Sequence, residues 1–265
     1  MMKAPQPNLD SSAQLEFEDA ARAMQMDPED RWVGGYAGYE WDHLRPLLNV
    51  YEMDVAGKEV MELGCNVGGS SVVLASMGAD VSAVDIDAGM IRIANANIAR
   101  HELTSSARTF HVDDTRKLPF SDEQFDHIVA NSVLEYVSSD HLPVLVAELQ
   151  RVLKPGGSLF ICGTASRIAP REIHSGRWLI NYVPRWVDRL LGRDFQRGLS
   201  PILLRRSLDG QFENRSASSW IKAREAIHGQ LSPPIRAMQI LAKFLCVSPG
   251  WMSPHLEMRL EKKSS

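Results

Sequence analysis

The sequence is short of the features that mark exported, membrane-spanning or metal-dependent proteins. The three cysteines, Cys65, Cys162 and Cys246, are far apart and odd in number, and no C-x-x-C pair or histidine cluster suggests a metal site. No run of about 18 apolar residues occurs, and the first residues lack the apolar stretch of a signal peptide. These absences predict a cytoplasmic protein with reduced thiols, no transmembrane segment and no metal.

The chain as a whole also carries little excess charge of either sign. A net charge of −4 over 265 residues gives no overall attraction to nucleic acid, and this length suits one α/β domain with a single core. The local distribution differs. Between Thr164 and Arg206 there are nine arginines, no lysine and three acidic residues, a local net charge of +6.

The most informative stretch is a short apolar strand, expected over 59–63, that runs into a glycine-rich turn. Gly64 and Gly68 permit a ligand to approach the backbone, and a helix over 69–77 directs its free N–H groups toward the same place. The carboxylate of Glu62 would repel a pyrophosphate but attract a cationic amino-acid tail or a ribose hydroxyl. The stretch therefore predicts a loop that holds a nucleoside.

A second acidic residue follows at the spacing of nucleotide-binding βαβ units. A strand over 80–85 ends in Asp85, about 20 residues after the glycine turn, where a carboxylate bonds ribose hydroxyls. Asn66 stands where a dinucleotide fingerprint has its middle glycine, and asparagine tolerates the left-handed backbone. Ile86 and Met90 could wall an adenine or belong to the core.

From residue 58 onward, expected strands and amphipathic helices alternate. The strands are predicted over 59–63, 80–85, 107–112, 125–131, 157–163 and 255–262, and the helices over 69–77, 88–101 and 139–152. Such alternation predicts a doubly wound, mostly parallel α/β sheet. Ligands of such sheets bind outside the carboxyl ends of the strands, which is where Glu62, Asp85, Asp114 and Asn131 fall.

Four motifs in this order resemble the class I S-adenosylmethionine-dependent methyltransferases, in particular the branch that acts on small molecules and lipid-linked quinones. The similar segments are 62–68, which matches an acidic-x-Gly-x-Gly-x-Gly loop except at Asn66, then 84–91, 112–120 with 125–126, and 149–157. The resemblance covers roughly residues 58–163. It implies S-adenosylmethionine as cofactor and a Rossmann-like, seven-stranded sheet with helices on both faces and a helical cap inserted after the fifth strand.

The resemblance also implies roles for individual residues. Asp114 aligns with a carboxylate that accepts a bond from the adenine amino group, and the N–H of Thr115 would reach the ring. Glu62 would orient the methionine moiety and Asp85 the ribose. The predicted cofactor site is completed by Gly64, Cys65, Asn66, Gly68, Ile86, Met90 and Asn131.

The region beyond Gly163 departs from the family pattern and is expected to select the acceptor. We expect a helical substrate cap over 164–253 and a last strand within 254–263. Apolar side chains are interleaved with the cap's arginines, which either form a solvated lid or recognise an anionic acceptor, a lipid-like acceptor or an anionic membrane surface. A second amphipathic stretch, 234–246, is expected to be core rather than membrane anchor.

Two further features are expected to lie near the bound methyl acceptor. His174 lies just after the fifth strand and is the candidate general base, because imidazole titrates near neutrality; the alternative is a structural hydrogen-bonder. The aromatic stretch 32–41 either folds over the ligands or plugs the base of the sheet. Residues 1–50 are then a helical, aromatic lid on a single domain, 1–265, with its cofactor-binding core at 58–163.

These observations predict an S-adenosylmethionine-dependent methyltransferase whose acceptor is a hydroxyl oxygen, with carbon or nitrogen as alternatives, on a small or lipid-linked molecule. Asn131 lacks the following prolines of enzymes that methylate base amino groups, which disfavours a nucleic-acid substrate. One rival is a non-catalytic module that binds the same cofactor. The other is a nicotinamide-dependent reductase, which would want glycine at position 66 and a Tyr-x-x-x-Lys motif that no tyrosine here begins.

Overall fold

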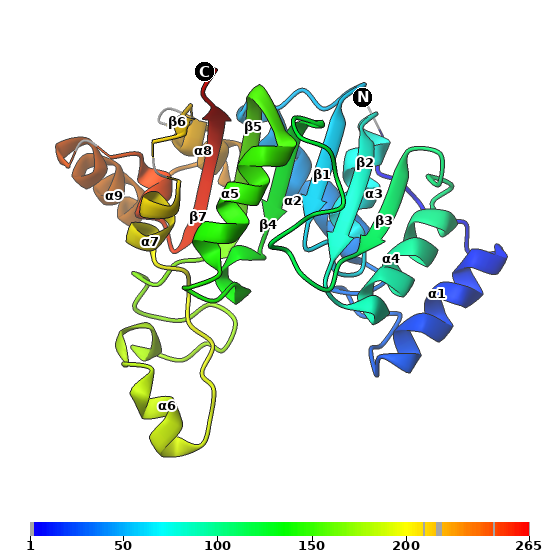
Figure 1. Cartoon of the computed structure of the whole chain (residues 1–265), viewed down its shortest axis with the longest axis horizontal. Coiled ribbons are helices and arrows are strands. Elements are labelled where there is room, and N and C mark those ends of the chain that lie inside the picture. Colours follow the sequence, from blue (N-terminus) through cyan, green and yellow to red (C-terminus); the bar gives the residue numbers. More distant parts are fainter. Residues whose placement is uncertain (1–2, 209, 216–218, 246, 265) are drawn as a thin grey trace.

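The computed structural model describes residues 3–208, 210–215, 219–245 and 247–264, and it contains one seven-stranded sheet in the order β3-β2-β1-β4-β5-β7-β6 (Figure 1). The strands are β1 (Glu59–Leu63), β2 (Asp80–Asp85), β3 (Ala107–His111), β4 (Phe125–Asn131), β5 (Leu153–Ala165), β6 (Phe212–Asn214) and β7 (His255–Lys262). The first five are parallel, and β7 runs antiparallel to β5 and β6. The predicted doubly wound sheet is confirmed. The sheet also contains a strand that was not among the predicted ones, β6, and this strand lies within the region that was expected to be helical.

The strand register brings the ends of β1, β2 and β4 to one level. Leu63, the last residue of β1, pairs with Val84 on one side and with Ala130 on the other. The loops that follow these three strands therefore leave the sheet side by side. This placement is what gathers the acidic side chains expected at the strand ends into one region.

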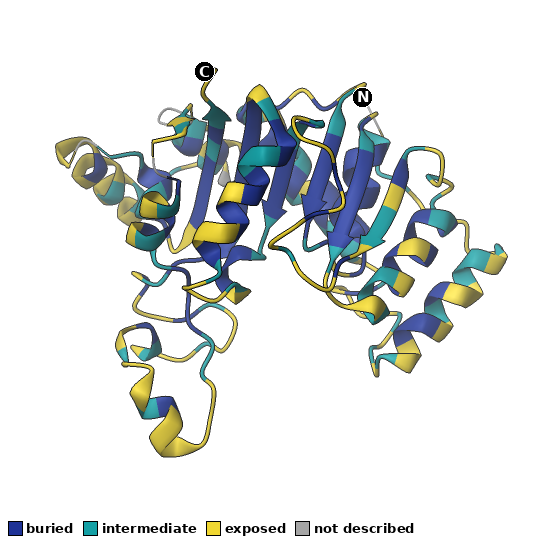
Figure 2. Ribbon diagram, in the orientation of Figure 1, coloured by how far each residue is buried: buried dark blue, intermediate teal, exposed yellow. Residues whose placement is uncertain are grey.

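Helices cover both faces of the sheet. They are α1 (Ser12–Ala23), α2 (Tyr36–Val50), α3 (Gly69–Ser76), α4 (Ala88–Arg100), α5 (Leu142–Val152), α6 (Trp186–Leu191), α7 (Pro201–Ser207), α8 (Ser219–His228) and α9 (Pro233–Phe244). Successive strand residues alternate between the faces: Met61 packs with α5 and α7, and Val60 packs with α2 and α3. Figure 2 shows the central strands buried, whereas the edge strand β3 and the outer helix surfaces are more exposed.

The N-terminal helices are attached to the sheet through α3 and α4. The α1 helix packs on α4, and buried Arg100 of α4 donates to the Gln14 side chain at 3.0 Å and to the carbonyl of Gly34 at 3.0 Å. The aromatic stretch divides between the two expected roles: Trp41 is buried in α2, whereas Trp32 remains 53% exposed. One part of this stretch is therefore core, and the other part is free to line a ligand site.

The region after β5 is less helical than expected. From here on, "cap" means residues 166–200 only, which extend beyond the carboxyl ends of the parallel strands and contain one α-helix, α6, and a short 3₁₀ helix, Ile180–Tyr182 (Figure 1). Buried Arg197 holds the cap together, because its guanidinium pairs with Asp188 at 2.6 Å and donates to the carbonyls of Val183 and Phe195. After the cap the chain returns to the sheet, where α7 packs on α5 and α8 packs on α2.

The prediction that 234–246 is core holds only in part for its described residues. Ala242 is buried and Ile235 and Met238 are half-buried, whereas Leu241 and Leu245 are 48% and 51% exposed. The short 3₁₀ helix Pro249–Trp251 contacts α9, while Ile240 and Phe244 are 72% and 83% exposed. Cys246, at the end of this stretch, lies outside the described residues. Within the described ranges, no helix combines the length and the apolar character needed to cross a bilayer.

Candidate functional site

Two cavities adjoin the loops that follow β1 and β4. Cavity A has a volume of about 590 Å³ and lies between these loops, the end of β2 and the start of α5. Cavity B has a volume of about 660 Å³ and reaches the N-terminal aromatic stretch and the cap. Gly64, Asn66, Ser132 and Tyr136 line both, so the two cavities are neighbouring compartments of one site at the carboxyl ends of the strands.

Cavity A collects the residues predicted to hold a nucleoside. Asp85, Ile86, Met90, Asp114 and Thr115 all line it. The carboxylate of Asp85 accepts the N–H of Asn66 at 2.8 Å and that of Asp87 at 3.0 Å, so it also shapes the glycine-rich loop. Ile86 is 65% exposed and is therefore not a core residue.

The carboxylate of Asp114 is engaged by a neighbour in the same loop. Arg116 pairs with it at 2.7 Å and donates to it through Nε at 2.8 Å. The hydrogen bonds from Arg116 lower the pKa of Asp114 to about 2, so this carboxyl is ionised at any physiological pH. Beside it, the hydroxyl of Thr115 lies 2.9 Å from Nε2 of His141, another residue of cavity A.

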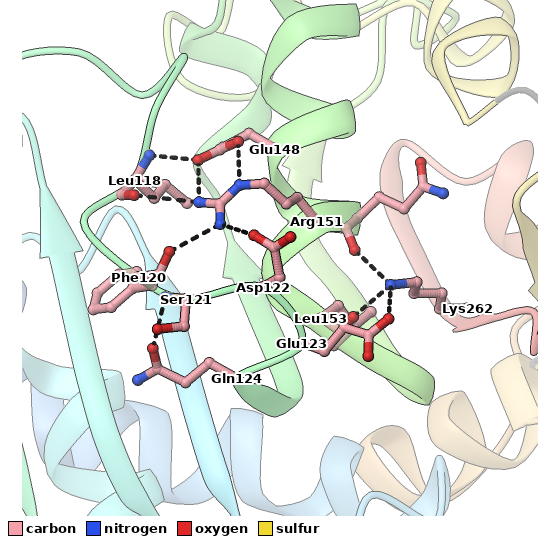
Figure 3. Close-up of polar contacts among 11 residues, drawn as sticks. Leu118, Phe120, Ser121, Asp122, Glu123, Gln124, Glu148, Arg151, Leu153 and Lys262 are labelled. Carbon is pink, nitrogen blue, oxygen red and sulfur yellow. Dashed lines mark hydrogen bonds and ion pairs between the residues drawn. The ribbon is translucent and has the colours of Figure 1, made fainter.

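A polar network fixes the segment between the Asp114 loop and β4 (Figure 3). Arg151 of α5 bonds the carboxylates of Glu148 and Asp122 at 2.6 Å each and donates to the Phe120 carbonyl at 2.9 Å. Glu148 in turn accepts the N–H of Leu118 at 2.6 Å. Because these bonds tie the segment to α5, the loop that carries Asp114 has a fixed downstream anchor.

Cavity B contains two buried carboxyl groups. Glu62 accepts the hydroxyl of Ser71, and burial raises its pKa to about 8. Glu40, from α2, accepts the side-chain amide of Asn131 at 3.1 Å, and burial raises its pKa as well. No lysine or arginine lines cavity B within the described chain. A cationic ligand is therefore the natural partner for this pair, since it would offset the cost of ionising both.

His174 enters cavity B from the cap and is paired with a buried acid. Its Nε2 lies 3.0 Å from Oε1 of Glu135, whose side chain is fully buried. Glu135 follows β4 and also accepts the N–H of Ala165 at 3.2 Å, and its second oxygen is buried with no hydrogen-bond partner among the described residues. The hydrogen bond that the Glu135 carboxylate accepts from the imidazole raises the pKa of His174. The turn that presents His174 is held by buried Glu172, which accepts the His174 N–H at 3.1 Å.

The structure thus brings eleven of the twelve predicted site residues to the two cavities. Cys65 and Asn131 line cavity B, together with Gly64 and Asn66. Gly68 lines neither cavity. Its φ of +78° caps α3 in the left-handed region, and an added Cβ would lie 3.0 Å from Ala94, so helix packing is reason enough for glycine there.

Sequence reasoning missed the residues whose importance comes from contacts distant along the chain. These are Glu40, Ser70, Glu135, Tyr136 and His141. A usable signal existed for two of them, because Glu40 and Glu135 are acids set among large apolar residues, a context in which an ionisable group rarely occurs unless it is paired. Among the described residues, no group of three or more His, Cys, Asp or Glu side chains is arranged for a metal ion.

Comparison with known proteins supports the same part of the chain. Residues 61–161 match the family described as "Methyltransferase domain". The core of this chain is a class I methyltransferase domain. Its class uses S-adenosylmethionine, and the predicted family and cofactor are both confirmed.

Individual relatives cover less than the whole chain. A protein named demethylmenaquinone methyltransferase from Clavibacter sepedonicus is 36% identical over 108 residues, which are 41% of this chain and 42% of that protein. Malonyl-[acyl-carrier protein] O-methyltransferase from Serratia marcescens is 26% identical over 148 residues, which are 56% of this chain and 48% of that protein. The chain thus spans under half the length of these relatives.

Structural similarity to known proteins covers more of this chain than sequence similarity does. The structure of an S-adenosylmethionine dependent methyltransferase from Mesorhizobium loti superposes with a TM-score of 0.52 at 20% identity, covering 82% of this chain and 96% of that one. The methyltransferase domain therefore keeps the family's sheet and helices.

Proposed function

We propose that the protein transfers a methyl group from S-adenosylmethionine to a hydroxyl oxygen of a small or lipid-linked molecule, with His174 as general base. The observation that carries this proposal is the contact of 3.0 Å between His174 and buried Glu135, in the same cavity as Glu62. An imidazole supported by a carboxylate is suited to removing a hydroxyl proton. A non-catalytic module that only binds the cofactor would have no need of such a pair.

The two cavities suggest how the residues divide the cofactor between them. In cavity A, Asp85 would bond the ribose, Asp114 and Thr115 would bond the adenine, and Ile86 and Met90 would lie against the ring. In cavity B, Glu62 would hold the methionine ammonium, beside Cys65, Asn66 and Asn131. Gly64 would permit close approach, because its φ is +72° and it has no side chain. Bound S-adenosylmethionine supplies a methyl group that is already electrophilic.

The protein's remaining task is to align the acceptor and take its proton. The buried Glu135 carboxylate favours the His174 tautomer whose Nε2–H donates to it, which leaves Nδ1 as the basic nitrogen. His174 would accept the hydroxyl proton at Nδ1 as the acceptor oxygen takes the methyl group from sulfur, whose bond to the methyl carbon breaks, and Glu135 would stabilise the resulting imidazolium. Alignment supplies most of the acceleration, and the base adds roughly 10²-fold to 10⁴-fold.

The acceptor class rests on the cap and on the relatives. The cap supplies Ile173 and His174 to cavity B and also carries exposed arginines and apolar side chains, a combination suited to an acceptor with an anionic group or a lipid tail. The names of two relatives, demethylmenaquinone methyltransferase and malonyl-[acyl-carrier protein] O-methyltransferase, support a small or carrier-linked acceptor. Both described cysteines, Cys65 and Cys162, are free, which supports a reducing compartment such as the cytoplasm.

The test begins with methyl-labelled S-adenosylmethionine and an extract of lipids and metabolites, with the product identified by mass spectrometry. On that acceptor, His174→Gln should lower turnover by about 10²-fold or more and leave cofactor affinity within about a factor of two. His255→Gln is the matched control, because His255 lines the same cavity but bonds only a backbone carbonyl.

Glu135→Gln gives an independent test through pH. The wild-type imidazole has a raised pKa, so its basic form appears only above that value, and the acidic limb of the rate profile marks it. Removing the carboxylate lowers the pKa of His174 toward 6.5, so the limb should move to lower pH. If His174→Gln keeps wild-type turnover from pH about 6 to about 9, or if the product is methylated on carbon, the base proposal fails.

A further inference from the structure

The cap exposes large apolar side chains, and of these Tyr182 also donates its hydroxyl to the Ile168 carbonyl at 2.6 Å. Each of the following is more than half exposed: Trp178, Leu179, Tyr182, Trp186, Leu190 and Leu191. The cap is held instead by polar groups, namely the buried Arg197–Asp188 pair and the Asn181 amide, which donates to the Ala169 carbonyl at 2.8 Å. These apolar side chains are therefore available to another surface.

The same surface is strongly basic. Arg171, Arg177, Arg185, Arg189 and Arg193 are exposed, and Asp194 is the one exposed acid of the cap. The cap's other two acids are turned inward: Asp188 pairs with Arg197, and Glu172 bonds the backbone of its own turn. Exposed aromatic, aliphatic and arginine side chains thus share one projecting segment.

The position of this segment connects it to the site. In Figure 1 the α6 end of the cap projects away from the sheet, on the side where the parallel strands end. Ile173 and His174 belong to the cap and line cavity B. A surface that receives the cap would therefore also receive the acceptor side of the site.

We propose that the cap docks on an anionic lipid bilayer, with its apolar side chains among the headgroups and its arginines at the lipid phosphates. Tryptophan and tyrosine favour this boundary, and arginines near an anionic surface add attraction that salt screens. An RNA partner would use the arginines but has no counterpart for the leucines of α6. The part of this inference that concerns delivery of a lipid-linked acceptor to cavity B rests on the proposed function.

The test uses the full chain and sedimentation with vesicles. Vesicles of phosphatidylcholine with about a quarter phosphatidylglycerol should bind the protein, pure phosphatidylcholine vesicles should bind it far more weakly, and a rise from about 50 to about 500 mM salt should weaken binding. Arg185→Gln with Arg189→Gln should weaken binding by about 30-fold. Trp186→Ala with Leu190→Ala should weaken it by about tenfold or more, because buried apolar area is lost.

Controls come from apolar residues of equal exposure outside the cap. Phe244→Ala on α9 and Leu15→Ala on α1 each remove a side chain that is more than half exposed, and both should bind vesicles within about twofold of the wild type. Circular dichroism and cofactor affinity should be unchanged in the cap variants. Equal loss in Phe244→Ala would overturn the assignment to the cap.

Other outcomes also separate this proposal from the previous one. If the protein does not bind anionic vesicles, or binds single-stranded RNA in preference to them, the cap does not dock on lipid as proposed. This holds even if the protein transfers methyl groups to a soluble acceptor. A protein that binds the vesicles through the cap but yields no methylated product supports the docking surface and overturns the proposed reaction.

Discussion

Cofactor binding should be coupled to the release of a proton from Glu62. This side chain is 2% exposed, and burial raises its pKa to about 8, so the free protein holds it protonated near pH 6 and ionises it only above about pH 8. A methionine ammonium in cavity B would favour the ionised form. Affinity should therefore rise with pH up to about pH 8, where the ligand's ammonium itself begins to lose its proton and the rise ends.

The size of the effect follows from the fraction of Glu62 that is ionised before binding. About half is ionised at pH 8 and about one per cent at pH 6, so affinity should fall by at least about tenfold between these values. Below pH 7 close to one proton should leave for each cofactor bound. S-adenosylhomocysteine has the same amino-acid end and should show the same dependence.

Calorimetry in two buffers of different ionisation enthalpy measures the released proton directly. Glu62→Gln should remove most of the release, and any remainder would belong to Glu40, whose pKa burial also raises. Asp114→Asn is the matched control, because the pKa of Asp114 is about 2 and this group has no proton to give. Wild-type affinity that is equal at pH 6 and pH 8, with no proton released, would refute the reasoning.

Two further predictions concern the loop and the cap. Asp85→Ala should weaken cofactor binding by ~1–3 kcal/mol while the protein stays folded. The substitution removes a partner of the ribose and also the acceptor of the Asn66 N–H. Unchanged affinity by calorimetry would contradict this prediction. Arg197→Leu should make residues 166–200 susceptible to limited proteolysis while the sheet remains resistant. The substitution removes the cation bonded to Asp188 and the hydrogen bonds to the Val183 and Phe195 carbonyls. Exposed Arg193→Leu serves as the control, and a cap that stays as resistant as in the wild type would disprove this role.

The sequence by itself determined the parts of this protein that depend on local pattern. Alternating apolar strands and amphipathic helices between 58 and 163 predict the parallel part of the sheet, because burial on both faces demands continuous apolar strands. The glycine-rich loop and the acids at strand ends predict the site for a similar reason, since strand order alone brings Glu62 and Asp85 to the same edge.

Only the tertiary structure decided which distant groups meet there. Glu40 reaches Asn131 across 91 residues, and His174 reaches Glu135 across 39, through packing that no local spacing encodes. Strand β6 has three residues, too few to show an alternation of apolar and polar side chains in the sequence. It forms because β7 provides the backbone partners with which it pairs. The apolar faces of α6 and α9 show the converse: a helical pattern predicts that one face is apolar, but what that face packs against depends on the elements around it.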